Sequence, residues 1–385
     1  MPKPSFEWPW SRANGGIVER KLAPSHRDGP QLPCKVSGMP RLIQALPNGA
    51  LDLIGDVHGE LEALLRLLHR LGVDVERARA PRHLVFVGDL IDRGPDSVGV
   101  VEVVELLMQA GVASVVAGNH ELNLLAGERK EGNGWFWGDA NDHAQFDLRQ
   151  AAFPSRLADT REQAKIRALF SELPLVLMRD DLRVVHASWD PEAAAKLPED
   201  GDIAKLAAFW EERLEGELQA SGLRDRAADE RAAFAGLTDE RIPPTRHLAA
   251  VAAEDAAYQR LNPIKLLTSG AEVEVAPGGH FFVGGKWRFV TRDRWWKRPV
   301  DRPTVIGHYW RRREHLTEGR PDVWDDVPPF AWAGDVYCVD YSVGRRFLER
   351  FRGRTEKFHG GLGALRWPER EVVFDDRDGS IPTGE

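Results

Sequence analysis

The sequence predicts an α/β protein with a parallel β-sheet, and three features support this prediction. Short apolar runs typical of buried strands begin at Leu51, Leu84 and Ala113. Two amphipathic helical segments, over about 60–71 and 97–110, separate these runs. Each run closes on a glycine or on polar residues, where the chain can turn. Strand, helix, strand, helix, strand is the order of right-handed βαβ units, whose strands pair in parallel.

The composition is that of an ordinary globular protein, with 385 residues of which 42% are hydrophobic and 29% charged. The formal net charge of −8 does not favour a stable nucleic-acid complex or binding to an anionic membrane. Only two cysteines occur, so a disulfide framework is excluded and a reducing compartment is expected. No run approaches the roughly 18 apolar residues of a membrane span. The sequence therefore predicts a cytoplasmic protein.

Three parts of the chain differ in composition. Residues 1–47 are rich in proline, glycine and charge, and we expect an irregular N-terminal arm. Residues 48–375 carry the patterns of one domain, in which a stretch of about 191–275, rich in Ala, Glu, Leu and Arg, predicts a helical insertion. Residues 376–385 are polar, and we expect them to form a frayed tail.

Further elements are expected along this domain. Helical patterns cover 122–126 and 160–172, and a hairpin is predicted around Arg179. Apolar runs predict strands at 175–178, 182–186, 281–290, 303–306, 335–340 and 371–374. The last two of these are expected to close a second sheet.

Side chains that can bind metal ions follow five of the expected strands. They are Asp56 with His58, Asp89, Asn119 with His120, His186, and His308. One strand followed by such a residue is common. Five strands followed by such residues form a specific pattern, because ligands collect at the carboxyl ends of strands in α/β sheets. Carboxylate, amide and imidazole groups together suit divalent manganese, iron or zinc. Asp89 stands between the groups of the first and third strands and is the expected bridge between two ions.

The stretch from Gly88 to Gly94 adds a second kind of chemistry. Asp92 and Arg93 follow Asp89 by three and four residues, so a guanidinium lies close to the expected metal ligands. Arginine can hold two phosphate oxygens at once through paired hydrogen bonds. By itself this stretch could equally be an ordinary turn with a solvated ion pair.

The motifs Gly55-Asp-Val-His-Gly59, Gly88-Asp-Leu-Ile-Asp-Arg-Gly94, Gly118-Asn-His-Glu121, His186 and Gly307-His308 resemble the signature of the calcineurin-like metallophosphoesterases. The resemblance is greatest to the phosphoprotein-phosphatase branch, which also contains symmetrical diadenosine tetraphosphate hydrolases. It implies a four-layer α/β/β/α fold with two mixed sheets. The stretch Val185-His186-Ala187-Ser188-Trp189 stands where the family often has His-Gly-Gly or His-Ala-Gly, and its tryptophan changes the expected pocket wall but no ligand.

This resemblance also implies a role for each residue. Asp56 and His58 would hold the first ion, Asp89 would bridge, and Asn119, His186 and His308 would hold the second. The two ions are expected to be manganese, with iron or zinc as alternatives. A hydroxide between them would attack phosphorus in line without a phospho-enzyme. Arg93 would bind the phosphate, His120 would protonate the leaving oxygen, and Asp92 would orient His120.

The expected activity is that of a phosphomonoesterase resembling Ser/Thr protein phosphatases, because Asp92, Arg93 and Glu121 are all present. The expected substrate is a phosphoprotein, a small phosphate ester or a nucleotide. The alternative is a nucleotide polyphosphate hydrolase of the diadenosine tetraphosphate type. A metal-binding interaction module without turnover is the alternative of another class, and the complete set of acid and phosphate-binding residues argues against it.

Two features leave their interpretation open. Segment 286–313 contains ten Lys or Arg against two Asp, interleaved with tryptophans, which suits either a nucleotide or an ordinary strand edge with solvated arginines. Its arginines at 288, 292 and 294 are candidates for a second phosphate ligand, and we favour Arg292. The loop 127–137, with Trp135, could be a substrate wall or core packing.

Overall fold

The computed structural model describes residues 39–130, 132–138, 155–283, 285–314, 323–354 and 356–384. The predicted N-terminal arm lies outside the described residues as far as residue 38. Among the described residues, no helix has both the length and the apolar character that crossing a bilayer requires.

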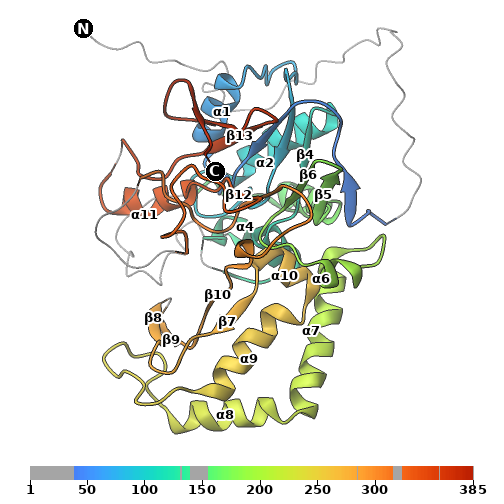
Figure 1. Ribbon diagram of the computed structural model, residues 1–385. Coiled ribbons are helices and arrows are strands. Elements are labelled where there is room, and N and C mark those ends of the chain that lie inside the picture. The colour runs from blue at the N-terminus through green and yellow to red at the C-terminus, as the bar shows by residue number, and fades with distance from the viewer. Residues whose placement is uncertain are drawn as a thin grey trace. The chain divides into compact units, whose positions relative to one another are not determined.

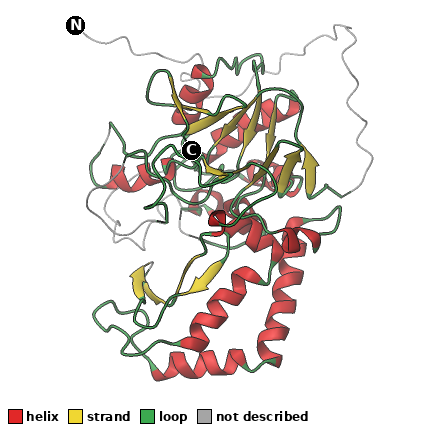
Figure 2. Ribbon diagram, viewed as in Figure 1, coloured by secondary structure: helices red, strands yellow, loops and turns green. Residues whose placement is uncertain are grey.

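A six-stranded sheet carries the first three strands that the sequence predicts (Figures 1 and 2). In spatial order its strands are β15 (Ser380–Pro382), β14 (Glu371–Phe374), β13 (Gly363–Trp367), β2 (Leu51–Ile54), β3 (His83–Phe86) and β4 (Ala113–Val115). Strands β2, β3 and β4 pair in parallel, as predicted. Strand β13 pairs antiparallel with β2, so that Leu365 lies opposite Leu53.

The second sheet has five strands. In spatial order they are β1 (Ile43–Ala45), β5 (Val176–Arg179), β6 (Leu182–Val185), β11 (Thr304–Ile306) and β12 (Val336–Cys338). Strands β5 and β6 form the predicted antiparallel hairpin, while β11 pairs in parallel with both β6 and β12. The prediction that 335–340 and 371–374 close one sheet is wrong, because β14 pairs with β13 beside β2.

Alternation of side chains along the strands divides the core into two parts. One set of strand residues lies between the sheets and includes Leu53, Val85, Val184, Val305 and Tyr337. Their neighbours in sequence face the helices and include Ile54, Phe86, Val185, Ile306 and Cys338. Successive side chains of a strand point to opposite faces of the sheet, so both sets can be buried only when other elements cover both faces. The two sheets therefore pack on each other, and helices cover the outer faces.

Helices on the outer faces complete the four-layer α/β/β/α fold that was predicted. They include α1 (Leu61–Arg70), α2 (Ser97–Gln109), α3 (Asn119–Leu125), α4 (Gly134–Trp137), α5 (Thr160–Ser171) and α11 (Arg346–Phe351). Helix α1 buries Leu64, Leu67 and Leu68 in the same cluster as Ile54 and Phe86 of the six-stranded sheet. Burial of one such side chain stabilises the fold by about 1.5–3 kcal/mol.

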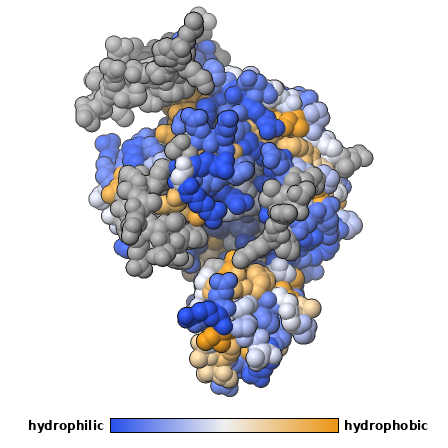
Figure 3. Space-filling view, turned by 90° about the vertical axis from the view of Figure 1, so that its left-hand side faces the viewer, coloured by the Kyte–Doolittle hydropathy of each residue, from blue (hydrophilic) through white to orange (hydrophobic). Residues whose placement is uncertain are grey.

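The stretch predicted as a helical insertion contains α6 (Pro191–Ala195), α7 (Ile203–Ala220), α8 (Leu223–Ala233), α9 (Ala249–Arg260) and α10 (Pro263–Ser269). Helices α7, α8 and α9 follow a U-shaped path at the lower end of Figure 1. Among the described residues, eight large hydrophobic side chains are exposed, and five of them belong to this region and the hairpin after it: Phe209, Ile242, Leu261, Phe281 and Val283. Figure 3 shows hydrophobic colours on this projection, below a mostly hydrophilic body.

Short strands follow the insertion. They are β7 (Glu272–Glu274), β8 (Phe281–Val283), β9 (Lys286–Arg288) and β10 (Val290–Arg292). Strand β8 pairs with β9, and β10 pairs with β7, both antiparallel. The single strand predicted for 281–290 is therefore wrong, and it is divided where Gly285 adopts a positive φ of 74°.

Both ends of the described chain are more ordered than the sequence predicts. Residues 43–45 form β1, and the flanking Leu42 and Leu46 are buried, so the irregular arm does not extend to residue 47. Residues 380–382 form β15 on the edge of the six-stranded sheet, where Ile381 packs against the core between the sheets. The expected frayed tail is corrected accordingly. In both places backbone hydrogen bonds to a neighbouring strand fix the segment.

Candidate functional site

The six predicted metal ligands converge at the carboxyl ends of strands from both sheets. Asp56 and His58 follow β2, and Asp89 follows β3. Asn119 opens α3 directly after β4. His186 and His308 follow β6 and β11 of the other sheet. Because the two sheets pack face to face, these edges meet, and the structure brings the predicted residues together.

Two groups of candidate ligand atoms share Asp89. One group is His58, Asp89 and His120, the other is Asp89, His186 and His308, and within each group the atoms lie within 4.8 Å of one another. The Oδ2 atom of Asp89 lies 3.9 Å from Nε2 of His58 and 3.3 Å from Nε2 of His186. Asp56 joins the first group through Oδ2, which lies 3.9 Å from Nε2 of His58. Asp89 therefore occupies the central place expected of a bridging carboxylate.

The orientation of the imidazole rings fits a site for cations. Nδ1 of His186 lies 2.7 Å from the carbonyl oxygen of Val87, and Nδ1 of His58 lies 3.1 Å from that of Ile91. Nε2 of His186 is buried without a hydrogen-bond partner among the described residues. A backbone carbonyl that holds one ring nitrogen and leaves the other as a ligand is the usual support of a metal-binding histidine, and His186 has this arrangement. In His58 the second nitrogen, Nε2, lies 2.6 Å from Nη1 of Arg93. Nδ1 of His308 and Oδ1 of Asn119 lie 2.8 Å apart, which places both at the second group.

Burial makes the charged forms of the side chains in this site unfavourable in free energy unless a counter-ion lies beside them. Burial, together with the carboxylates of Asp340 and Asp89, raises the pKa of Asp56 well above its usual range. Burial also lowers the pKa of His308 well below its usual range, with a contribution from Arg292. Divalent cations stabilise ionised carboxylates and neutral imidazoles, so they would relieve both effects.

The backbone of the site adopts an uncommon conformation. Of nine described non-glycine residues with positive φ, five belong to the site: His58, Asp89, Asp92, Arg93 and His308, at 48°, 50°, 75°, 71° and 64°. Such conformations cost about 1–3 kcal/mol each and persist where surrounding contacts enforce them. Neighbouring glycines leave the necessary room, since a Cβ at Gly307 would collide with Oδ1 of Asp56. The turns that follow β2, β3 and β11 thus direct their side chains toward the candidate metal site.

A histidine and carboxylate pair lies beside the candidate ligands. Nδ1 of His120 is 2.5 Å from Oδ2 of Asp92, and Nε2 of His120 is 3.9 Å from Oδ2 of Asp89. His120 therefore presents Nε2 to the same place as the ligands. The other oxygen of Asp92 accepts a hydrogen bond of 2.8 Å from Nε1 of Trp135. The carboxylate is thus held from both sides.

Glu121 is a structural support of the site. Its carboxylate accepts hydrogen bonds from the backbone N–H groups of Asp89, Leu90 and Gly118 at 2.8–2.9 Å. Burial, with the nearby charge of Asp89, raises the pKa of Glu121 to about 7. The side chain ties the turn after β3 to the start of α3, and so fixes Asp89 relative to Asn119.

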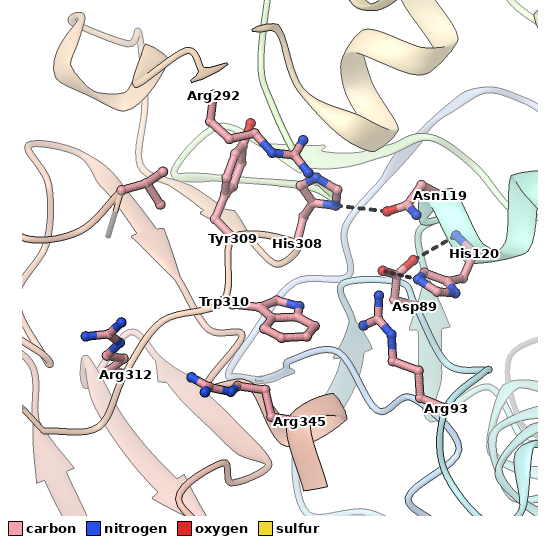
Figure 4. Close-up of a pocket in the computed structure, with 11 residues that line it drawn as sticks. Asp89, Arg93, Asn119, His120, Arg292, His308, Tyr309, Trp310, Arg312 and Arg345 are labelled. Atoms are coloured by element: carbon pink, nitrogen blue, oxygen red, sulfur yellow. Dashed lines mark hydrogen bonds and ion pairs between the residues drawn. The ribbon is translucent and has the colours of Figure 1, made fainter. Parts of the chain in front are cut away.

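An open cavity of about 470 Å³ lies over the candidate ligands (Figure 4). Its lining consists of Asp89, Arg93, Asn119, His120, Arg292, His308, Tyr309, Trp310, Arg312, Val323 and Arg345. Of the three candidates for a second phosphate ligand, only Arg292 lines it. Arg288 pairs with Glu272 at 2.7 Å, and Arg294 with Asp326 at 3.2 Å. Nη1 of Arg292 donates to the carbonyl of Ser269, and its role as the second phosphate ligand stays a prediction.

Most of the basic segment 286–313 has a structural role. Arg311 is 1% exposed and donates to the backbone carbonyls of Cys338, Pro328 and Ala331. Arg313 pairs with Asp376 at 2.6 Å. Trp295 and Trp296 are core residues. The local charge therefore does not form one continuous anion-binding surface, and of the basic residues described in this segment only Arg292 and Arg312 line the cavity.

The loop after α3 packs against the site and does not form an exposed wall. Trp135 and Phe136 are each 1% exposed. The N–H group of Arg93 donates to the carbonyl of Gly132 at 3.0 Å, so this loop also fixes the turn that carries Arg93. Sequence reasoning missed the bond from Trp135 to Asp92, because an aromatic residue in a glycine-rich loop gives no indication of its direction.

The fold is that of an α/β/β/α metallophosphoesterase. Residues 51–217 match the family model described as calcineurin-like phosphoesterase. This match agrees with the resemblance that the motifs predict. The matched region contains every predicted site residue except Arg292 and His308.

Relatives with curated names include bis(5′-nucleosyl)-tetraphosphatases. An asymmetrical enzyme of Anoxybacillus flavithermus is 33% identical over 144 residues, which cover 35% of this chain and 55% of the relative. A symmetrical enzyme of Ralstonia nicotianae is 46% identical over 82 residues, which cover 20% and 26%. The chain spans between 30% and 55% of the length of the first two curated relatives it matches.

Solved structures are similar at lower identity. A protein described as a putative diadenosine tetraphosphatase is 17% identical, with a TM-score of 0.39 over 89% of this chain and 100% of that one. A cold-active protein-tyrosine phosphatase of a Shewanella species is 16% identical, with a TM-score of 0.38 over 88% and 83%.

Proposed function

We propose that the chain is a two-metal phosphoester hydrolase with the phosphomonoesterase activity expected from its motifs. The observation that carries this proposal is the pair of His120 and Asp92, which lies beside two groups of metal ligands and an arginine in one cavity. A metal-binding module without turnover has no need of such a pair.

Each residue of the cavity has a defined task in this proposal. Asp56, His58 and Asp89 would hold one divalent ion, and Asp89, Asn119, His186 and His308 the other. The ions would activate water and neutralise the charge of the phosphate. Arg93 and Arg292 bind the phosphate oxygens, for which the planar guanidinium is well suited. These arginines also orient the phosphorus toward the ligand groups.

His120 moves a proton to the leaving oxygen. Asp92 accepts the proton of Nδ1 in a hydrogen bond, so a protonated His120 carries its second proton on Nε2, which faces the ligands. Protonation of the leaving oxygen lowers the barrier most when the leaving group is a poor one.

A nucleotide polyphosphate hydrolase is the second candidate. Two observations favour it: four arginines line the cavity, and the curated relatives are named tetraphosphatases. Both candidates use the same ligands and the same acid, and they differ only in what the outer part of the cavity binds. The preference for manganese and the cytoplasmic location stay predictions.

The test compares three substrates with the manganese-loaded protein: a phosphopeptide, an aryl phosphate and diadenosine tetraphosphate, each with analysis of the products. We expect hydrolysis that stops on chelation and returns when manganese is added. Release of phosphate from the first two supports the phosphomonoesterase. Cleavage of the dinucleotide alone supports the second candidate. No hydrolysis of any of the three with manganese, iron or zinc would reject both.

Trp135→Phe tests the support of the acid. The change removes the hydrogen bond to Asp92 and keeps an aromatic ring in the core. Hydrogen bonds to charged groups contribute about 1.5–3 kcal/mol, so we expect kcat for an alkyl phosphate to fall about 10-fold or more with little change in KM. A dinitrophenyl phosphate, whose leaving group needs no proton, should be nearly unaffected.

Trp137→Phe is the matched control, because Trp137 lies on the same short helix and its N–H donates to Asn133 instead. This control should leave the rates on both substrates unchanged. Equal losses on the alkyl and the dinitrophenyl phosphate in Trp135→Phe would show that Trp135 only maintains the fold.

A further inference from the structure

The backbone fixes the point from which the side chain of Arg93 starts. Arg93 and the preceding Asp92 both have a positive φ, of 71° and 75°. The backbone N–H group of Arg93 donates to the carbonyl of Gly132 at 3.0 Å, and a Cβ at Gly132 would lie only 3.1 Å from Cγ of Arg93. The aliphatic part of Arg93 is therefore packed directly on the backbone of the loop after α3.

The guanidinium group at the other end of this side chain lies against three parts of the chain. Its Nη1 is 2.6 Å from Nε2 of His58. A Cβ at Gly344 would lie 3.2 Å from the same Nη1 and 2.5 Å from Cδ2 of His58. The guanidinium carbon lies over the indole of Trp310, 5.0 Å from the ring centre (Figure 4). We call the space between His58, Gly344 and Trp310 the guanidinium slot.

Trp310 is a well-fixed wall of this slot. Before it in the chain, Tyr309 is buried, and its carbonyl oxygen accepts a hydrogen bond of 2.6 Å from Nε1 of Trp324. After it, Arg311 is buried, and its backbone N–H group donates to the carbonyl of Asp340 at 2.8 Å. The half-buried indole thus starts from a segment that is held on both sides, which suits a residue that must keep a neighbour in place.

An aromatic wall can hold a guanidinium group without using its hydrogen bonds. The attraction between the cation and the ring acts through the face of the guanidinium. The N–H groups lie in the guanidinium plane and stay available for phosphate oxygens. Among the residues that the structure describes, no carboxylate forms an ion pair with Arg93. The indole therefore holds Arg93 where an acidic partner would compete with the phosphate.

We propose that Trp310 is a positioning residue, which keeps the guanidinium group of Arg93 in the direction that phosphate binding requires. The proposal rests on the proposed function, because that function assigns the phosphate to Arg93. Trp310 then acts through Arg93 and does not itself touch the phosphate. This role separates Trp310 from the core residues Trp295 and Trp296 of the same basic segment.

The experiment measures binding to the manganese-loaded protein by calorimetry. The probes are inorganic phosphate and phenylphosphonate, whose carbon–phosphorus bond is not hydrolysed. We expect Trp310→Leu to weaken the binding of both probes at least about 5-fold, because the aromatic face is lost. Trp310→Phe keeps an aromatic face and should weaken both less than about threefold. A loss in Trp310→Phe as large as that in Trp310→Leu would contradict the role of the aromatic face.

Arg93→Gln supplies the comparison that a merely structural role would not satisfy. This change removes the group that Trp310 is proposed to hold. In the Arg93→Gln background, Trp310→Leu should therefore change the affinity for phosphate less than about twofold, since residues that act through each other are not additive. If Trp310 only maintains the fold, Trp310→Leu will lower the affinity by the same factor in both backgrounds.

Trp210→Leu is the matched control. The indole of Trp210 also faces an arginine, Arg213, at 5.7 Å from the ring centre, but this pair lies on α7 and does not line the cavity. The control should leave the affinities for both probes unchanged. Thermal unfolding of each variant verifies that it is folded.

The outcomes separate this proposal from the proposed function. Equal losses in both backgrounds would overturn the positioning role even if an aryl phosphate is hydrolysed. A loss for phenylphosphonate alone would also overturn it, because the indole would then contact the organic group of the ligand. Losses that depend on Arg93, in a protein that hydrolyses none of the test substrates, would support the positioning role and reject the proposed function.

Discussion

Replacing His120 with alanine is expected to lower kcat for an alkyl phosphate by about 10²–10⁴-fold, the usual contribution of general acid–base catalysis. The bound metal should stay at the level of the unmodified protein. The reason is geometric: Nδ1 of His120 is engaged by Asp92 at 2.5 Å, and Nε2 is directed at the ligand groups. Steady-state kinetics with elemental analysis of the same samples makes the measurement.

The same experiment decides between two roles of His120, because its Nε2 also falls within one group of candidate ligand atoms. If His120 binds an ion, His120→Ala will lose metal together with activity. If it is the acid, the loss will be much smaller for a dinitrophenyl phosphate than for the alkyl ester. His69→Ala, at an exposed position on α1, is the control and should change neither quantity.

Replacing Asp89 with asparagine is expected to remove activity and bound metal together. Although burial opposes it, the positive charge of His186 and His120 holds the pKa of Asp89 well below its usual range, so the carboxylate is charged. Asparagine keeps the size but removes this charge from between both groups of ligands. Loss of a supporting residue already weakens metal binding about 10–100-fold, and a shared ligand should contribute more.

Thermal unfolding adds a measurement that does not depend on turnover. Manganese should raise the melting temperature of the unmodified protein, because an ion that binds only the native state stabilises it. Manganese should change the melting temperature of the Asp89→Asn variant little. Asp74→Asn, an exposed carboxylate that pairs with Arg77, is the control. Full metal occupancy in Asp89→Asn would contradict the bridging role.

The candidate metal ligands that directly follow an apolar run were predictable from the sequence. Asp56, Asp89 and His186 each follow an apolar run, and the parallel order of β2, β3 and β4 fixes where such runs end. The packing of two sheets then brings all these ends together. The prediction needed only the position of each residue relative to its strand.

Features that depend on distant contacts were not predictable. Strand β13 contains Gly363 and Arg366, and pairing with β2 gives it its place, since the segment has no marked strand pattern of its own. The charge of segment 286–313 does not reveal that Arg311 is buried while Arg312 lines the cavity, because adjacent residues point in different directions. Arg345 shows no pattern at all, and only the packing of Gly344 on His58 places it at the cavity.

The pairing of β13 with β2 has a consequence for how the protein is made. Strand β2 leads directly to Asp56 and His58, but its second neighbour in the sheet comes from the far end of the sequence. During synthesis this strand keeps one edge open until residues 363–367 have left the ribosome. Contacts between such distant segments form slowly, since a long loop must close before they are gained. The nascent chain thus completes the surroundings of its first metal ligands late in folding.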